Sequence, residues 1–132
     1  MFGALEAGTS ALVAQRIRMD TIAGNVQNVS TTQRADGEPG PYRRRVALFA
    51  TGDGRGQPGV HVAEIIEDPS PLRRVHEPGH PMADSEGYVW YPNVDPSVEM
   101  VNMIEAARAY EANVTAMEVT KSMMASTLRL LA

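Results

Sequence analysis

The sequence contains no cysteine, and only seven of its 132 residues are aromatic: one tryptophan, four tyrosines and two phenylalanines. The absence of cysteine excludes disulfide bonds, a cysteine nucleophile and a cysteine-ligated metal site. No apolar run approaches the roughly 20 residues needed to cross a bilayer, so we expect no direct membrane span. Glu6 comes early, and no basic segment precedes a continuous apolar core. We therefore expect no cleavable secretory signal peptide.

Positive charge is also scarce, and the formal net charge is −4. General nucleic-acid binding needs a concentrated basic face for contact with phosphates. The only basic run, Arg43-Arg44-Arg45, begins a strand-like segment, where a solvated strand edge explains it. We therefore expect no nucleic acid among the partners.

Proline and glycine are rare at the two ends of the chain. Eight of the nine prolines and eight of the eleven glycines lie between Gly37 and Pro92, which excludes a long helix there. Residues 96–131 contain no glycine and no proline after Pro96, and they predict one helix roughly 54 Å long at 1.5 Å per residue. Asp95 can cap this helix, and Pro96 suits its first turn.

The C-terminal helix carries two neighbouring apolar rows. One row recurs every seven residues and consists of Met103, Tyr110, Met117, Met124 and Leu131. The other consists of Met100, Ala107, Val114 and Leu128, with Lys121 interrupting it. Rows that are three and four residues apart form one continuous helical seam. A seam of this length needs a partner helix of similar length.

Residues from about 3 to 29 supply a candidate partner helix. Leu5, Leu12, Met19 and Val26 recur every seven residues, Ile22 and Val29 join them one turn along, and Gln15 is a polar intruder. Three glycines in this segment each cost up to about 1 kcal/mol relative to alanine, so packing should supply most of its stability. Two interpretations remain open: a compact helix pair with an ordinary core, or a coiled coil that continues into neighbouring subunits.

The middle of the chain predicts β-structure. Residues 43–50 and 60–66 are strand-like, the glycine-rich loop 51–59 between them predicts a hairpin, and the aromatic segment 88–91 is β-prone. These segments have too few apolar residues to bury a large core, so the helices or another subunit should cover them. The predicted fold class is α+β: terminal helices at 1–30 and 95–132 form a coiled-coil-like layer, with a small β-rich insert at 31–94.

Patterns typical of catalysis or metal binding are weak. His76 and His80 are four residues apart, but Pro78-Gly79 lies between them, so they do not share a helical face. The glycines at 52, 54 and 56 are not followed by the Gly-Lys-Ser/Thr ending of a phosphate-binding loop. A small hydrolase using His76, His80 and Asp84 would require a pocket that the sequence gives no reason to expect. We expect no enzyme activity, no catalytic or metal-binding residues and no cofactor.

Short motifs along the whole chain resemble those of bacterial flagellar rod and hook proteins. The N-terminal motifs are Ala14-Gln15, Arg18-Met19-Asp20, Ile22-Ala23, Asn25 and Asn28. The central motifs are Pro41-Tyr42-Arg43-Arg44, Glu77-Pro78-Gly79-His80-Pro81, Ala83-Asp84, Gly87-Tyr88-Val89 and Pro92-Asn93-Val94-Asp95. The C-terminal motifs are Glu99-Met100-Val101-Asn102, the run from Ala107 to Val114 and Lys121-Ser122-Met123. Their order resembles most closely the proximal-rod proteins of the flagellar basal body.

The resemblance implies a structural subunit of the periplasmic rod that helps to transmit torque from the motor. In such proteins the terminal helices form a tubular inner layer around the export channel, and the β-rich part lies farther out. The implied partners are other proximal and distal rod proteins, the basal-body ring and export apparatus, and copies of the chain itself. The implied route of secretion is the flagellar type III apparatus, without cleavage of a signal.

On this interpretation the helical seams are the assembly interface. The predicted interface residues are Leu5, Leu12, Met19, Ile22, Val26, Met103, Tyr110, Val114, Met117, Met124, Leu128 and Leu131. A methionine-rich seam can repack against non-identical neighbours because thioether side chains are adaptable, although a private methionine-filled core is the plain alternative. The terminal helices also permit a different function, that of a soluble helical adaptor or chaperone-like binding protein.

Overall fold

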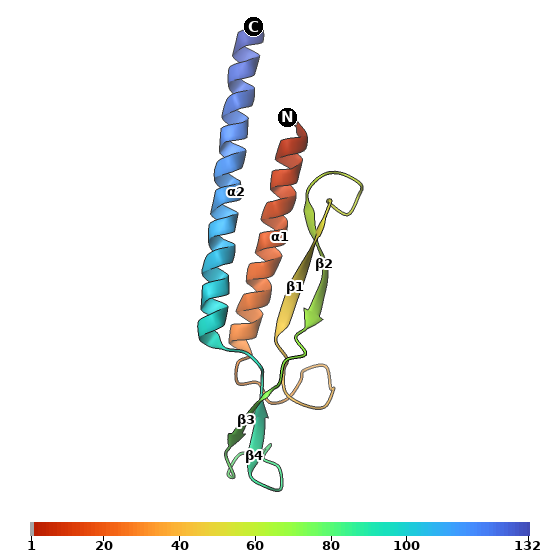
Figure 1. Ribbon diagram of the computed structural model, residues 1–132, viewed down its shortest axis with the longest axis vertical. Helices are drawn as coiled ribbons and strands as arrows, with labels where there is room; N and C mark the ends of the chain where they lie inside the picture. The colour runs from red at the N-terminus through yellow and green to blue at the C-terminus, as the bar shows by residue number, and fades with distance from the viewer. Residues whose placement is uncertain (1) are drawn as a thin grey trace.

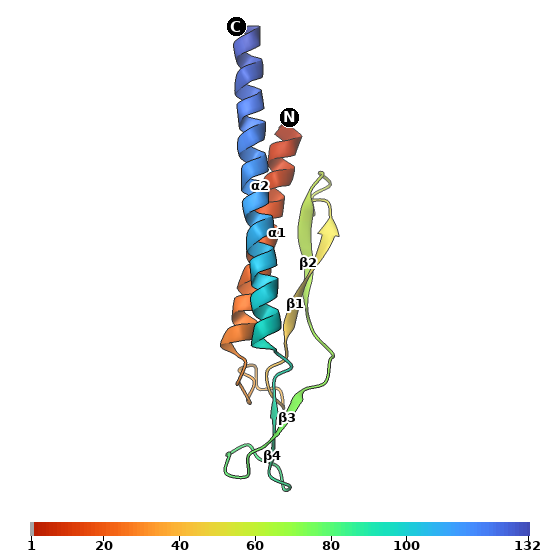
Figure 2. The ribbon, with the colours of Figure 1, turned by 60° about the vertical axis from the view of Figure 1, so that its left-hand side comes forward.

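The computed structural model describes residues 2–132 and shows an elongated molecule built around two long helices. Helix α1 (Phe2–Gln27) and helix α2 (Pro96–Leu131) run antiparallel and side by side, and α2 extends beyond the N-terminal end of α1 (Figures 1 and 2). Four short strands lie between the helices in the sequence. The predicted α+β fold, with long terminal helices and a small antiparallel β insert, is confirmed.

The ends of the helices follow from local side-chain hydrogen bonds. Asp95 is the N-cap of α2, and its Oδ1 accepts a hydrogen bond from the Ser97 backbone N–H at 2.9 Å, as predicted. Helix α1 ends at Gln27, two residues earlier than predicted. The Asn28 side-chain amide donates to the Gly24 carbonyl at 2.8 Å, so this side chain satisfies a carbonyl of the last turn.

The first β hairpin lies along α1. Strands β1 (Arg45–Thr51) and β2 (Val60–Glu67) pair antiparallel, with a β-bulge between Leu48 and Phe49, and the predicted loop 51–59 joins them. Figure 1 shows α1 between this hairpin and α2. Gly59 lies so close to α1 that an added Cβ would be 2.4 Å from the Ser10 Oγ. The Val60 N–H also donates to that oxygen at 3.1 Å, so backbone and hydroxyl dock the hairpin on the helix.

A second, smaller hairpin lies at the end of the molecule opposite the chain termini (Figure 1). Strand β3 (Arg73–His76) pairs antiparallel with β4 (Tyr88–Tyr91). The sequence predicted an extended segment at 88–91 but missed β3, which has a single apolar residue, Val75. The Arg74 guanidinium lies 3.9 Å from the centroid of the Tyr88 ring. This cation–π contact across the two strands provides part of the stabilisation that alternating apolar residues provide in other hairpins.

The buried core is thin. Within residues 2–132 its apolar members are Ala14, Ile22, Val89, Val94 and Ala106. The two helices approach closely at Gly8, where an added Cβ would lie 2.7 Å from the Met117 Cγ. Small residues at the helix contact explain how two long helices pack together while burying little volume. Neither helix of the described chain has a segment long and apolar enough to cross a membrane.

Candidate assembly interface

The structure places most of the predicted interface residues at the contact between the helices. Ile22 is buried, and Leu5, Leu12, Met19, Met103, Tyr110, Val114, Met117 and Met124 are half-buried. Three others are exposed: Val26 by 42%, Leu128 by 66% and Leu131 by 79%. The predicted seam is therefore mainly the contact between α1 and α2 within one chain, and the assembly role of these twelve residues stays a prediction.

Leu128 and Leu131 are exposed because α2 is longer than α1. Since Gly8 packs against Met117 and the helices are antiparallel, the first residues of α1 lie about level with residue 123 of α2. The last turns of α2 have no partner, and Leu130 there is 86% exposed. A free apolar helix end is typical of a surface that another chain covers.

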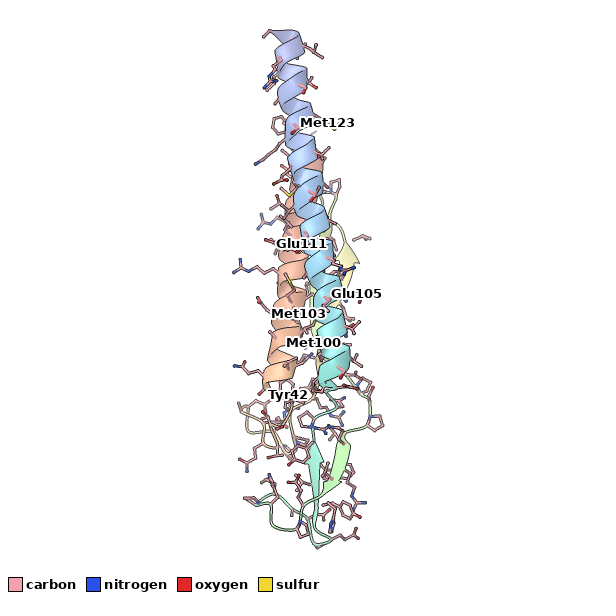
Figure 3. The ribbon with its side chains drawn as sticks, turned by 90° about the vertical axis from the view of Figure 1, so that its left-hand side faces the viewer. Tyr42, Met100, Met103, Glu105, Glu111 and Met123 are labelled. Carbon is pink, nitrogen blue, oxygen red and sulfur yellow. The ribbon has the colours of Figure 1, made fainter. Side chains whose placement is uncertain are left out.

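Other apolar side chains are exposed along the length of α2. Exposed apolar side chains begin in its first turns and continue past its middle (Figure 3). They include Val98, Met100, Val101, Ile104, Val119 and Met123, each at least 50% exposed. Seven residues on one side of this helix line a shallow, open depression: Thr115, Glu118, Val119, Ser122, Met123, Ser126 and Thr127. Exposed apolar surface on this scale marks an interaction site.

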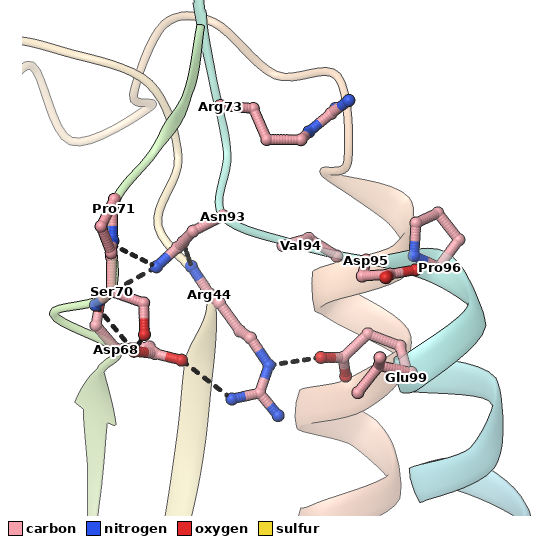
Figure 4. A pocket seen from close by; sticks show the side chains of 11 residues that line it. Arg44, Asp68, Ser70, Pro71, Arg73, Asn93, Val94, Asp95, Pro96 and Glu99 are labelled. Atoms are coloured by element: carbon pink, nitrogen blue, oxygen red, sulfur yellow. Dashed lines mark hydrogen bonds and ion pairs between the residues drawn. The ribbon is translucent and has the colours of Figure 1, made fainter.

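A buried polar network joins the helix pair to the β insert. Glu99 of α2 and Asn25 of α1 are both fully buried. The Arg44 Nε donates to the Glu99 Oε1, and its Nη1 donates to the Asp68 Oδ2 at 3.1 Å (Figure 4). Asn25 donates to the Arg45 carbonyl at 2.8 Å and accepts from the Arg45 N–H at 2.9 Å. These bonds connect α1, α2, the start of β1 and the segment after β2.

Asn93 and Asp68 extend this network at the edge of a pocket between the insert and α2 (Figure 4). The Asn93 Oδ1 accepts from the Arg44 N–H at 2.8 Å, and its Nδ2 donates to the Asp68 carbonyl at 3.0 Å. The Ser70 hydroxyl and backbone N–H, together with Arg44, lower the pKa of Asp68 below its ordinary value. Burial lowers the pKa of Arg44, but hydrogen bonds and charge from Glu99 and Asp68 outweigh that effect and raise it. Both members of this ion pair are therefore charged at neutral pH.

This network was not predicted from the sequence. Glu99 lies in the first turn of α2, where an acidic side chain is favourable on an exposed surface, but its carboxylate is buried against Arg44. Asn25, Arg44 and Glu99 all lie in motifs that carry the resemblance to rod proteins, which was the one available signal. The charged side chains of the network, Arg44, Asp68 and Glu99, are paired with one another, as in a structural joint between the helices and the insert.

The residues of the hydrolase alternative have structural partners. His76 packs edge-to-face on Tyr88, with ring centroids 4.8 Å apart, and the His80 Nδ1 accepts the Met82 N–H at 3.0 Å. The Asp84 Oδ1 accepts the backbone N–H groups of residues 86 and 88, both at 2.9 Å, and holds the β3–β4 turn. Among residues 2–132 no three histidine, aspartate or glutamate side chains gather closely enough to hold a metal ion.

Comparison with known proteins identifies the family. Residues 5–33 match the family described as flagella basal body rod protein, and residues 85–130 match the flagellar basal body rod FlgEFG protein C-terminal family. The chain is 41% identical to the flagellar basal-body rod protein FlgC of Bacillus subtilis, over 98% of this chain and 97% of that protein. It is 47% identical to the FlgC of Yersinia enterocolitica, over 92% and 90% of the two chains. The FlgC of Salmonella typhimurium is 44% identical over the same shares. Both terminal helices and the insert thus align with these rod proteins, and the chain belongs to the FlgC family of flagellar basal-body rod proteins.

Proposed function

We propose that the chain is a structural subunit of the flagellar basal-body rod, at its proximal part. The observation that carries this proposal is similarity to FlgC proteins over nearly the full length of both chains. The relatives are named as rod proteins, so we propose a structural role without catalysis or a cofactor. No observation favours the alternative of a soluble adaptor or chaperone-like protein.

The shape of the molecule supports assembly through its terminal helices. We propose that residues 1–30 and 95–132 form the axial core of the rod and that the insert, 31–94, lies farther out. The α1–α2 pair is long, its own core is thin, and α2 leaves an apolar face and an apolar end uncovered. Many such contacts repeated along a helical assembly give a stiff shaft that can transmit torque.

The partners in this proposal are other rod proteins, the ring and export apparatus, and further copies of the chain. A subunit among non-identical neighbours needs surfaces that adapt to each of them. Met100 and Met123 are exposed by 65% and 59% on α2, and flexible thioether side chains can fill differently shaped gaps.

Substitution of Leu128 by aspartate tests this function, because Leu128 is exposed and its replacement leaves the contacts inside the chain intact. In a bacterium whose own gene for this chain is deleted, the wild-type chain should restore rods and swimming, whereas Leu128→Asp should not. Arg55→Asp in the hairpin loop is the control and should restore both. Normal rods and motility in the deletion strain, or a wild-type chain absent from purified basal bodies, would contradict the proposal.

A further inference from the structure

Helix α1 has an open face that neither α2 nor the hairpin covers. Along this face, exposed residues are separated alternately by four and three positions, as on one face of a coiled coil. They are Phe2, Glu6, Thr9, Val13, Arg16, Asp20 and Ala23. We refer to these seven residues as the α1 outer face. Arg16 and Asp20 are its adjacent charges of opposite sign.

Helix α2 has a matching open face on the side away from α1. Its exposed residues are also separated by three and four positions, and Figure 3 shows Glu111 on this helix. They are Val101, Ile104, Arg108, Glu111, Thr115, Glu118, Ser122 and Ala125. We refer to them as the α2 outer face. Arg108 and Glu111 are its adjacent charges of opposite sign, in the order that can pair with the α1 outer face.

The two outer faces are complementary in one antiparallel register. When Arg16 lies opposite Glu111, the next layer places Asp20 opposite Arg108, so both charge pairs are attractive. One heptad from Arg16 along α1, Ala23 then lies opposite Ile104, which is 50% exposed.

A shift of one heptad in either direction removes this match. Arg16 would then face Glu118 or Ile104, and Asp20 would face Thr115 or Val101. In neither case do both charges find a partner. Complementary charges fix the register of a helix contact more than they supply its affinity. The outer faces therefore specify one alignment.

The two outer faces cannot meet within one chain, and their complementarity to each other favours a second copy of the chain as the partner. Within one chain the helices meet through other faces, with Gly8 against Met117 and the Arg18 Nη2 at 3.4 Å from the Glu105 Oε2. This internal alignment differs from the outer-face register by only about three residues, roughly 4.5 Å at 1.5 Å per residue. A neighbouring copy in the same orientation, displaced by that small distance along the axis, brings its α1 outer face to the α2 outer face.

We propose that neighbouring copies join in this way, with Arg16 of one copy opposite Glu111 of the next and Asp20 opposite Arg108. The proposal rests on the proposed function, because it names the contact between copies within the rod. Each copy uses α1 for one neighbour and α2 for the other. The interface is therefore heterologous and propagates around or along a helical assembly without closing in a two-fold dimer.

Disulfide cross-linking tests the register directly, because the chain has no cysteine of its own. Ala23→Cys and Ile104→Cys are introduced into two separate chains that are expressed together, so any disulfide between positions 23 and 104 joins two copies. Basal bodies are purified and oxidised, and dimers are measured by immunoblot. The matched control pairs Ala23→Cys with Glu118→Cys, on the same face but fourteen residues, about 21 Å, away.

A disulfide needs Cα atoms within about 7 Å, so only the proposed pair should react. We expect at least about ten-fold more dimer from positions 23 and 104 than from the control, and none from either variant alone. Equal dimer in both mixtures, or no dimer from positions 23 and 104, overturns the register. If the chain is present in the basal bodies but does not cross-link, the register fails and the rod function stands. If the wild-type chain is absent from them, the rod function itself fails.

Charge exchange gives an independent test, because Arg16 and Glu111 form no ion pair with each other within the chain that the structure describes. In the background of the cysteine pair, Arg16→Glu or Glu111→Arg alone should lower the dimer yield about five-fold. The combination Arg16→Glu with Glu111→Arg should restore it. Loss of cross-linking in the combination as severe as in the single variants would overturn the pairing of these two residues.

Discussion

Replacement of Arg44 by methionine should strongly destabilise the chain. Arg44 is the charged partner of Glu99, whose carboxylate is fully buried at the start of α2. In the variant, the Glu99 carboxylate keeps only the Asn25 side-chain amide, which lies at 3.5 Å. Removal of one partner of a buried ion pair costs about 3–5 kcal/mol, because the remaining charge stays away from water without compensation.

The expected loss follows from which charge is left behind. Asp68 retains the hydroxyl and backbone N–H of Ser70, at 2.6 and 2.9 Å, so it contributes little to the cost. Glu99 contributes most of it, and we expect the free energy of unfolding to fall by about 3 kcal/mol. When Glu99 is replaced by methionine as well, both charges are gone. Most of the stability should then return, because a buried ion pair is often no more stable than apolar residues of similar size.

Urea unfolding followed by circular dichroism at the helical band measures this difference. Arg18→Met is the matched control, because its ion pair with Glu105 joins the same two helices but is exposed, with 67% of the Glu105 side chain accessible. That variant should lose at most about 1 kcal/mol. If Arg44→Met lost no more than Arg18→Met, or if the double variant were as unstable as Arg44→Met alone, the buried network would not hold the insert to the helices.

Three further predictions concern the hairpin, the α2 cap and acid. Gly59→Ala should undock the hairpin from Ser10 and lower the free energy of unfolding by about 1–3 kcal/mol more than Gly56→Ala, because both glycines have positive φ but only Gly59 lies against α1. Hydrogen exchange of residues 45–67 would show the lost protection, and equal protection in the two variants would contradict the prediction. Asp95→Ala should lower the free energy of unfolding by about 1 kcal/mol and Asp95→Ser by much less, which urea titration can measure; equal losses would exclude capping by the side chain. The pKa of Asp68 is below its ordinary 3.8 in the folded chain, so its contribution to stability is present above that pH and is lost as the pH falls through the lower folded value. Asp68→Asn should therefore flatten the fall in unfolding free energy below about pH 4, and an unchanged slope would refute this.

The helices were predictable because their signals are local. The Asp95-Pro96 sequence predicted where α2 begins, and the absence of later glycine or proline predicted that it continues without a break. Val26 was assigned to the internal seam, but the structure buries Asn25 in that region and leaves Val26 outside.

The joint between helices and insert was not predictable because it depends on topology. Asn25 and Glu99 are 74 residues apart and meet only after the insert has folded between the helices. A polar residue in a predicted helix gives no signal that distinguishes burial from exposure unless its partner is known. Strand β3 was missed for the same reason: it has no alternating apolar pattern, and it is stabilised by pairing with β4 and by the contact of Arg74 with Tyr88.

Electron cryomicroscopy of basal bodies from the bacterium that makes this chain would show whether the chain is a rod subunit that assembles through its helices. We expect density for α1 and α2 side by side in the wall of the rod, with neighbouring subunits in contact through these helices. We also expect the β1–β2 and β3–β4 hairpins outside that helical layer. A rod whose density is complete without this chain, or subunits joined only through the β insert, would contradict this expectation.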